Sequence, residues 1–250
     1  MSEEIAEPIP SAEPEAQPRS RRFVVDQQFM LTAVLATIIV ILAVVATIVL
    51  YGLEVSKAPR TVVERAVATA ETATQEQPKV AQSWVDLTYA YVAADRYADA
   101  RSASANGKRV ANLPAFYMAD AYMLEKQGKM AEAIAAYEAA KKRAIEYYDE
   151  RVKAASAKGA TYVASNSELA DAAIFKARLL AKQGEGAAAL EEYAIALKVD
   201  PRMADVLVEQ ADVKAALGDL AGARADYNAA LRFIPDMPEA LKGLAKVGGE

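Results

Sequence analysis

Residues 184–201 read GEGAAALEEYAIALKVDP, and residues 218–235 read GDLAGARADYNAALRFIP. The two stretches lie 34 residues apart, and a glycine, three alanines, a tyrosine, a leucine and a proline stand at matching positions. In each stretch the glycine follows one apolar-periodic run, and the proline follows the next such run. Glycine is favoured just after the C-terminus of a helix, and proline disfavours continuation of a helix. Each unit is therefore predicted to contain a helix, a tight turn and a second helix that ends before the proline. A unit this short cannot bury its apolar face alone, so the units are predicted to stack.

The matching small residues stand where two helices must approach closely, and the tyrosine fills the space beside them. This pattern resembles the tetratricopeptide repeat, a helix pair that recurs every 34 residues. Two further stretches match the same repeat pattern. The matching residues are Trp84, Leu87, Tyr91, Tyr97 and Ala100 in the first and Gly128, Ala133, Tyr137 and Ala140 in the second. Residues 63–78 fit a lone second helix.

The expected fold is all-α, with an N-terminal transmembrane helix followed by a solenoid of antiparallel helix pairs, as the resemblance implies. The expected segments are a disordered acidic, proline-rich cytoplasmic tail with a basic flank (1–28), a transmembrane helix (29–53), a linker with a lone repeat helix (54–80), the repeat array (81–237), and a capping helix with a tail (238–250). Leu241, Leu244 and Val247 are expected to form the apolar side of the capping helix.

The repeat spacing breaks once, because Tyr137 and Tyr193 are 56 residues apart rather than 34. The additional stretch predicts a helical extension at about 144–165. Gly159 is expected to end the lengthened helix, and Ser165 with Glu168 predicts a capping box for the next one.

Two interpretations of this extension stay open. It is either a tolerated insertion or a protruding helix pair whose exposed Tyr147 and Tyr148 form a docking surface.

The stretch from Phe29 to Leu53 holds 25 residues without a charge. About 20 apolar residues cross a bilayer, so a single-pass anchor is expected, with the lipid bilayer contacted through residues 29–53. A cleaved signal peptide is the rival reading, but its only nearby cleavage candidate, residues 56–58, is followed by Pro59. Arginine and lysine counts on the two sides are tied, and the denser arginine cluster before the span favours a cytoplasmic N-terminus and an extracytoplasmic array in the cell membrane.

The composition leaves little room for catalysis. The chain has no histidine and no cysteine, which removes the commonest general base and the thiolate and imidazole metal ligands. The carboxylate pairs lie in helical patterns beside lysine or arginine, as on solvated faces. The chain has a net charge of −5 and therefore also lacks the positively charged surface that nucleic acid binding requires. We therefore expect no enzyme, no cofactor and no metal site, and a protein partner of unknown identity.

The resemblance implies that the first helix of each repeat lines a concave groove for a partner peptide or helix. By that pattern the groove residues are Val85, Tyr89, Met118, Tyr122, Ile174, Arg178, Val208 and Asp212. Some of these residues could instead pack between helices. Relatives that grip a C-terminal carboxylate use lysine, asparagine and arginine at fixed groove positions, and no position matches here. An apolar or aromatic partner segment is therefore expected, with Arg178 supplying the one charged contact.

Two functions remain in view. The first is a membrane-tethered scaffold or adaptor, similar to the single-pass repeat proteins that serve envelope assembly, secretion or cytochrome c maturation. The second is a structural subunit of a larger membrane complex, in which the array acts as a spacer.

Overall fold

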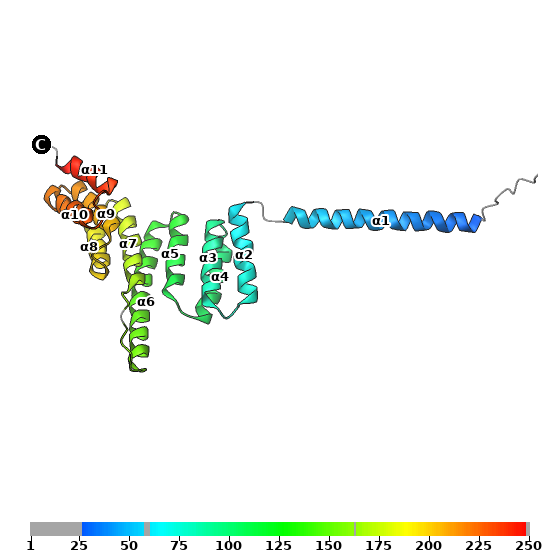
Figure 1. Cartoon of the computed structure of the whole chain (residues 1–250), viewed down its shortest axis with the longest axis horizontal. Helices are drawn as coiled ribbons and strands as arrows, with labels where there is room; N and C mark the ends of the chain where they lie inside the picture. The colour runs from blue at the N-terminus through cyan, green and yellow to red at the C-terminus, as the bar shows by residue number, and fades with distance from the viewer. Residues whose placement is uncertain (1–26, 58–60, 163, 249–250) are drawn as a thin grey trace, which may run out of the picture. The chain divides into compact units, whose positions relative to one another are not determined.

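The computed structural model describes residues 27–57, 61–162 and 164–248, and every regular element in them is a helix. The chain divides into two units, residues 1–58 and residues 59–250. Figure 1 shows the helices of the second unit following one another in chain order. The helices are α1 (Gln27–Lys57), α2 (Val62–Glu76), α3 (Ala81–Ala93), α4 (Tyr97–Val110), α5 (Pro114–Lys126), α6 (Met130–Ser156), α7 (Ser167–Lys182), α8 (Gly186–Val199), α9 (Ala204–Ala216), α10 (Leu220–Phe233) and α11 (Pro238–Val247).

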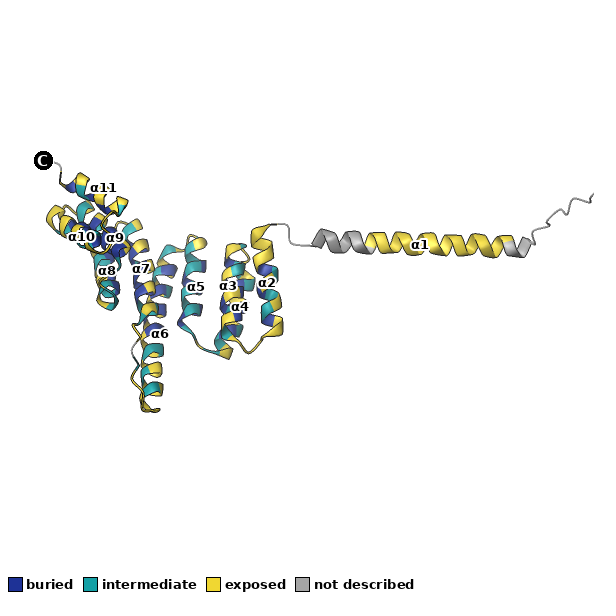
Figure 2. Cartoon of the chain, in the orientation of Figure 1, coloured by how far each residue is buried: buried dark blue, intermediate teal, exposed yellow. Residues whose placement is uncertain are grey.

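Helix α1 contains a stretch, Met30–Val49, with a mean hydropathy of 2.9, and its side chains are exposed (Figure 2). By length and composition this helix could cross a membrane. The hydroxyls of Thr37 and Thr47 donate to the carbonyls of Ala33 and Ala43, each at 2.8 Å, so both are satisfied inside the helix. The tail expected before the span lies, up to residue 26, outside the described residues.

The second unit consists of the lone helix α2, four helix pairs and the terminal helix α11. The pairs are α3 with α4, α5 with α6, α7 with α8, and α9 with α10. The repeat predicted from the sequence therefore has the expected all-helical form. Helix α2 begins with a capping box, in which Thr61 and Glu64 satisfy each other's backbone N–H groups.

Small residues allow the paired helices to approach, as the sequence pattern predicted. Ala133, Ala189, Ala196, Ala223 and Ala230 are each fully buried. In the first pair Gly107 takes the place that Ala196 and Ala230 hold in later pairs, and the fully buried Phe116 fills the space beside it.

Four tyrosines add hydrogen bonds to this packing, and three of them hold the recurring position of the second helix. Each of four hydroxyls donates to a carboxylate on an adjoining helix, and the four pairs are Tyr91 with Glu71, Tyr137 with Glu125, Tyr193 with Glu209, and Tyr227 with Asp212. Burial and these carboxylates raise the pKa of each phenol, so all four remain neutral donors at physiological pH.

The insertion is one long helix and an irregular return, rather than the protruding helix pair of the second interpretation. Helix α6 continues to Ser156, and no described residue between 160 and 166 is helical. Its last buried residue is Ala144, and Figure 2 shows no buried residue along the rest of it. Gly159 has a positive φ of 70° after the end of the helix. The cap of α7 is Asn166 rather than Ser165, because the Asn166 side chain accepts from the Leu169 N–H and also donates to the Ala144 carbonyl.

Different residues cover the apolar surface at the two ends of the array. Trp84 lies partly buried beside α2, and its indole N–H donates to the Pro78 carbonyl at 2.9 Å. At the other end α11 buries Ala240, Gly243 and Val247. Leu241, expected on the apolar side, is instead 49% exposed, because the buried side is turned by one residue.

Candidate functional site

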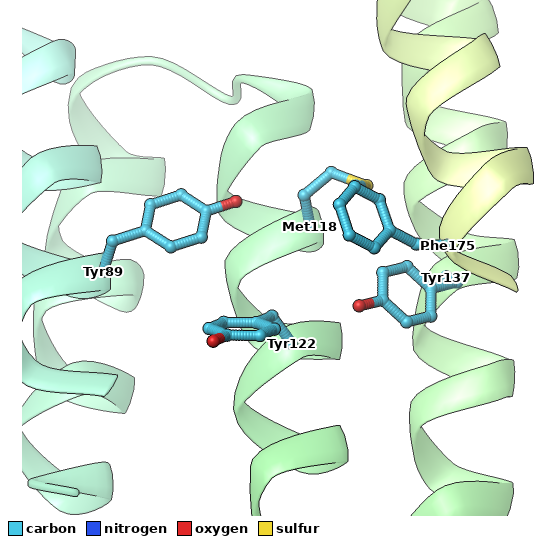
Figure 3. A pocket seen from close by; sticks show the side chains of 5 residues that line it. All are labelled: Tyr89, Met118, Tyr122, Tyr137 and Phe175. Carbon is cyan, nitrogen blue, oxygen red and sulfur yellow. The ribbon is translucent and has the colours of Figure 1, made fainter. Parts of the chain in front are cut away.

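The candidate site is an aromatic pocket between the first helices of three successive pairs. Tyr89 comes from α3, Met118 and Tyr122 from α5, Phe175 from α7, and Tyr137 from the second helix α6. Figure 3 shows the five side chains converging from these helices. The pocket has a volume of ≈ 290 Å³. Ligand pockets span about 300–1,000 Å³, so this one suits one or two side chains of a partner.

Two aromatic pairs form the walls of this pocket. The rings of Tyr89 and Tyr122 lie 6.3 Å apart at 40°, while Tyr137 and Phe175 stack at 5.9 Å and 9°. Met118 also lines the pocket, and Figure 3 shows its side chain among the rings. Tyr137 is wholly buried, whereas Tyr89 and Phe175 are each 37% exposed. The pocket therefore has a fixed floor and an accessible rim.

The hydroxyl groups of Tyr89 and Tyr137 are neutral. Burial, together with the charges of Asp171 and Asp120, raises the pKa of Tyr89 to about 12. Burial and Glu125 raise the pKa of Tyr137 further. Because neither phenol ionises near neutral pH, the pocket offers aromatic faces and hydroxyl dipoles to a partner.

The eight residues predicted for the groove divide into three groups. Tyr89, Met118 and Tyr122 line the pocket together. Val85, Ile174 and Val208 are less than 10% exposed and pack between helices, which corrects their assignment as a binding surface. Arg178 and Asp212 are exposed but already bonded: Arg178 donates twice to Glu209, at 2.9 and 2.7 Å, and Asp212 accepts from Tyr227 at 2.5 Å.

Tyr137 and Phe175 are not among the eight groove residues predicted from the sequence. Tyr137 carries the aromatic position of the second repeat helix, which pattern reading places in the core. Phe175 directly follows the predicted Ile174, and the structure buries Ile174 and turns Phe175 to the surface. A difference of one residue in helix rotation separates the two, and the apolar spacing did not define it that finely.

The alternative docking surface is engaged by the chain itself. Tyr148 packs edge-on against Tyr162 with ring centroids 5.4 Å apart. The Tyr147 ring lies 5.6 Å from the guanidinium groups of both Arg143 and Arg151. Both tyrosines are half-buried. Tyr148 ties the long helix to its return segment, while Tyr147 contacts arginines of the long helix itself. Both expose less ring surface than expected.

The described residues contain no group of three or more acidic side chains placed to hold a metal. Some of their charged groups form ion pairs between helices. The most buried one joins Lys141 on α6 and Lys176 on α7 to Glu192 on α8, each at 2.7 Å.

Comparison with known proteins identifies the repeat. Residues 176–238 match the family model described as tetratricopeptide repeat. No curated protein sequence matches the chain.

Solved structures share the fold. BtubC from P. vanneervenii is similar at 17% identity with a TM-score of 0.60, over 76% of this chain and 85% of that one. PilW, a type IV pilus biogenesis factor, is similar at 17% identity with a TM-score of 0.54, over 75% of this chain and 79% of that one.

Proposed function

Because the chain belongs to the tetratricopeptide repeat proteins, we propose that it is a membrane-tethered adaptor whose aromatic pocket binds a segment of a partner protein. The repeat fold supports a protein–protein interaction scaffold, and the pocket supports a particular place on it. The pocket draws on α3, α5 and α7, the first helices of three consecutive pairs. These are the helices that the family resemblance assigns to the groove.

The observation that carries this proposal is the exposed aromatic rim. Tyr89 and Phe175 are each 37% exposed at the mouth of an apolar pocket, although helix packing could have buried both. Tyrosine and methionine suit partner recognition, because tyrosine brings contact area at low entropic cost and methionine adapts its shape. No catalytic role is proposed.

The tether in this proposal is α1. Its apolar stretch is long enough to span a bilayer and contains no charge that would point to a transport path. We propose that the N-terminus is cytoplasmic and the array extracytoplasmic, where an envelope assembly, secretion or cytochrome c maturation partner would meet it. The likeness to PilW is a likeness of fold, so it does not select pilus assembly among these roles.

The test is site-specific photo-crosslinking in membranes. A photoreactive phenylalanine analogue replaces Phe175 in one protein and Phe233 in a matched control, since Phe233 is 44% exposed at the far end of the array on α10. A crosslinked partner is expected from the Phe175 position only. A hot-spot aromatic contributes about 2 kcal/mol or more, so Tyr122→Ala should weaken capture about thirtyfold without unfolding the array.

Two outcomes would overturn this proposal. Equal crosslinking from Phe175 and Phe233 would leave the array as a spacer in a larger complex. Capture that survives Tyr122→Ala but is lost when Tyr147 and Tyr148 are both changed to alanine would move the binding site to the insertion.

A further inference from the structure

The charges around the aromatic pocket are unbalanced. Arg178, which lies beside the pocket residue Phe175, and Lys108, the partner of Asp120, are both neutralised by the chain itself. Arg178 is held by Glu209 through two hydrogen bonds, and Lys108 is paired with Asp120 at 2.5 Å. A partner carboxylate would therefore find no free cation among these groups.

Two carboxylates near the pocket lack a cation. Glu125 accepts the hydroxyl hydrogen of the pocket residue Tyr137 at 3.0 Å and has no ion pair in the described part of the chain. The side-chain carboxylate of Asp171 on α7 has neither a hydrogen bond nor an ion pair among the described residues. Burial and the neighbouring Glu168 raise the pKa of Asp171, while the charge of Arg178 acts in the opposite direction. Asp171 stands one helical turn before the pocket residue Phe175 on α7, and both side chains are exposed, so the carboxylate lies on the same face of the helix as the pocket rim. Its charge acts on the Tyr89 hydroxyl at the pocket rim.

Four aromatic rings add to this negative character. The face of an aromatic ring carries a partial negative charge and attracts a cation placed within about 6 Å of its centroid. The chain already uses this contact, since the Arg178 guanidinium lies 5.4 Å from the Phe175 centroid and the Arg96 guanidinium lies 4.3 Å from that of Tyr91. Rings and unpaired carboxylates thus favour the same kind of ligand.

We propose that the pocket binds an arginine side chain within an otherwise apolar segment of the partner. This inference rests on the proposed function and adds the chemistry of the bound group. A guanidinium is planar and weakly hydrated, so it loses less than an ammonium on entering an apolar site and stacks on ring faces. Asp171 supplies the opposite charge at the rim, while Tyr89 and Tyr122 supply the ring faces. The charged contact is therefore made by a carboxylate of this chain rather than by Arg178.

The test compares two small probes on the full chain in detergent micelles. n-Butylguanidinium reproduces the arginine side chain, and n-butylurea has nearly the same size without the charge. Methionine methyl groups are labelled with carbon-13, and the Met118 signal, assigned with Met118→Leu, reports on the pocket. At constant ionic strength, the guanidinium should shift the Met118 signal with a dissociation constant about tenfold lower than that of the urea.

Two acidic residues on different helices serve as matched variants. Asp171→Asn should remove most of the preference for the charged probe. Asp149→Asn, an exposed change on the α6 extension, should leave that preference intact. If Asp171→Asn left the preference unchanged, the assigned role of this carboxylate would be refuted.

The outcomes separate this inference from the proposed function. Equal affinity for both probes, with photo-crosslinking from the Phe175 position still dependent on Tyr122, would refute the arginine pocket and leave the adaptor. No response of Met118 to either probe, with crosslinking independent of Tyr122, would refute both.

Discussion

The turn inside each helix pair contains one residue in the left-handed backbone conformation, with a positive φ. In the first pair this residue is not a glycine. Gly128, Gly184 and Gly218 take φ values of 74°, 83° and 86° in the later pairs. Asp95 stands at the matching position with a φ of 56°, the only positive φ outside glycine among the described residues. Its carboxylate accepts a hydrogen bond from the Tyr97 hydroxyl at 2.6 Å. Aspartate tolerates this conformation better than most residues but still with strain.

Replacing Asp95 with glycine should therefore stabilise the array. Removing the left-handed strain is expected to contribute about 1 kcal/mol, partly offset by the lost bond to the half-buried Tyr97. The measurement is the midpoint of chemical unfolding. Gly184→Asp is the reverse change at the equivalent turn and should lower the midpoint. A lower midpoint for Asp95→Gly would show that the tyrosine contact outweighs the strain.

At Gly107 a larger residue is excluded for a different reason, because other side chains already fill the space beside it. A Cβ at this position would lie 2.2 Å from the Phe116 ring and 2.7 Å from the Cβ of Trp84. Gly107→Ala should destabilise the array by about 1–3 kcal/mol, less the roughly 1 kcal/mol that alanine contributes to helix propensity. Unfolding measurements on Gly107→Ala, Phe116→Leu and the double variant provide the check. The double variant should recover part of the loss, and strict additivity would contradict the contact.

At the scale of the helix, the buried ion cluster joins α6, α7 and α8 where the repeat spacing is broken. Lys141 and Glu192 have side chains only 9% and 8% exposed, and Lys176 bonds to both Glu192 and Glu138. Glu138 is 56% exposed, and hydrogen bonds from Lys176 and Lys141 hold its pKa below the ordinary value. The stabilisation from Glu138 is therefore present at neutral pH and is lost in acid, as the pH falls through the lowered pKa.

The two glutamates of this cluster should differ sharply in their effect on stability. Glu192→Gln leaves the two lysines to share the exposed carboxylate of Glu138 and should cost about 3 kcal/mol. Glu138→Gln removes an exposed partner and should cost about 1 kcal/mol or less. Thermal or chemical unfolding of the two variants side by side measures the difference. Similar losses would mean that water reaches the cluster and screens both charges.

The elements show what a sequence can and cannot predict here. The helix pairs were predictable because Gly184, Gly218 and the prolines after α8 and α10 mark boundaries that local chemistry enforces. The insertion was visible only as a break in spacing. Its return segment was not predictable, since Asn166 rather than Ser165 caps α7, and the choice depends on the tertiary bond to Ala144. Only part of the pocket lining was predicted, because the exact rotation of α7 decides whether Ile174 or Phe175 faces outward.

At the scale of the whole chain, residues 1–58 and 59–250 form separate units. We predict that the first unit is retained as an anchor rather than removed as a signal peptide. Its apolar stretch, Met30–Val49, is longer than the roughly 7–15 residues of a signal peptide core. Intact mass or N-terminal sequencing of the membrane-extracted protein checks this, and a mature chain beginning near Pro59 would refute it.

The predicted orientation has a test of its own. Protease added to spheroplasts should digest the array if it lies outside the cytoplasm. Protection of the array in intact spheroplasts, with digestion after lysis, would reverse the topology.

Because of Trp84, tryptophan fluorescence and circular dichroism report on different parts of the array. Trp84 is the chain's one tryptophan, and it lies in α3 against the lone helix α2, so its fluorescence reports the first pair. Circular dichroism instead sums over every helix. In a solenoid each pair contacts only its neighbours, and pairs of unequal stability can separate in an unfolding experiment. Fluorescence and circular dichroism curves that diverge would then measure how unevenly stability is spread along the array, without any label being attached.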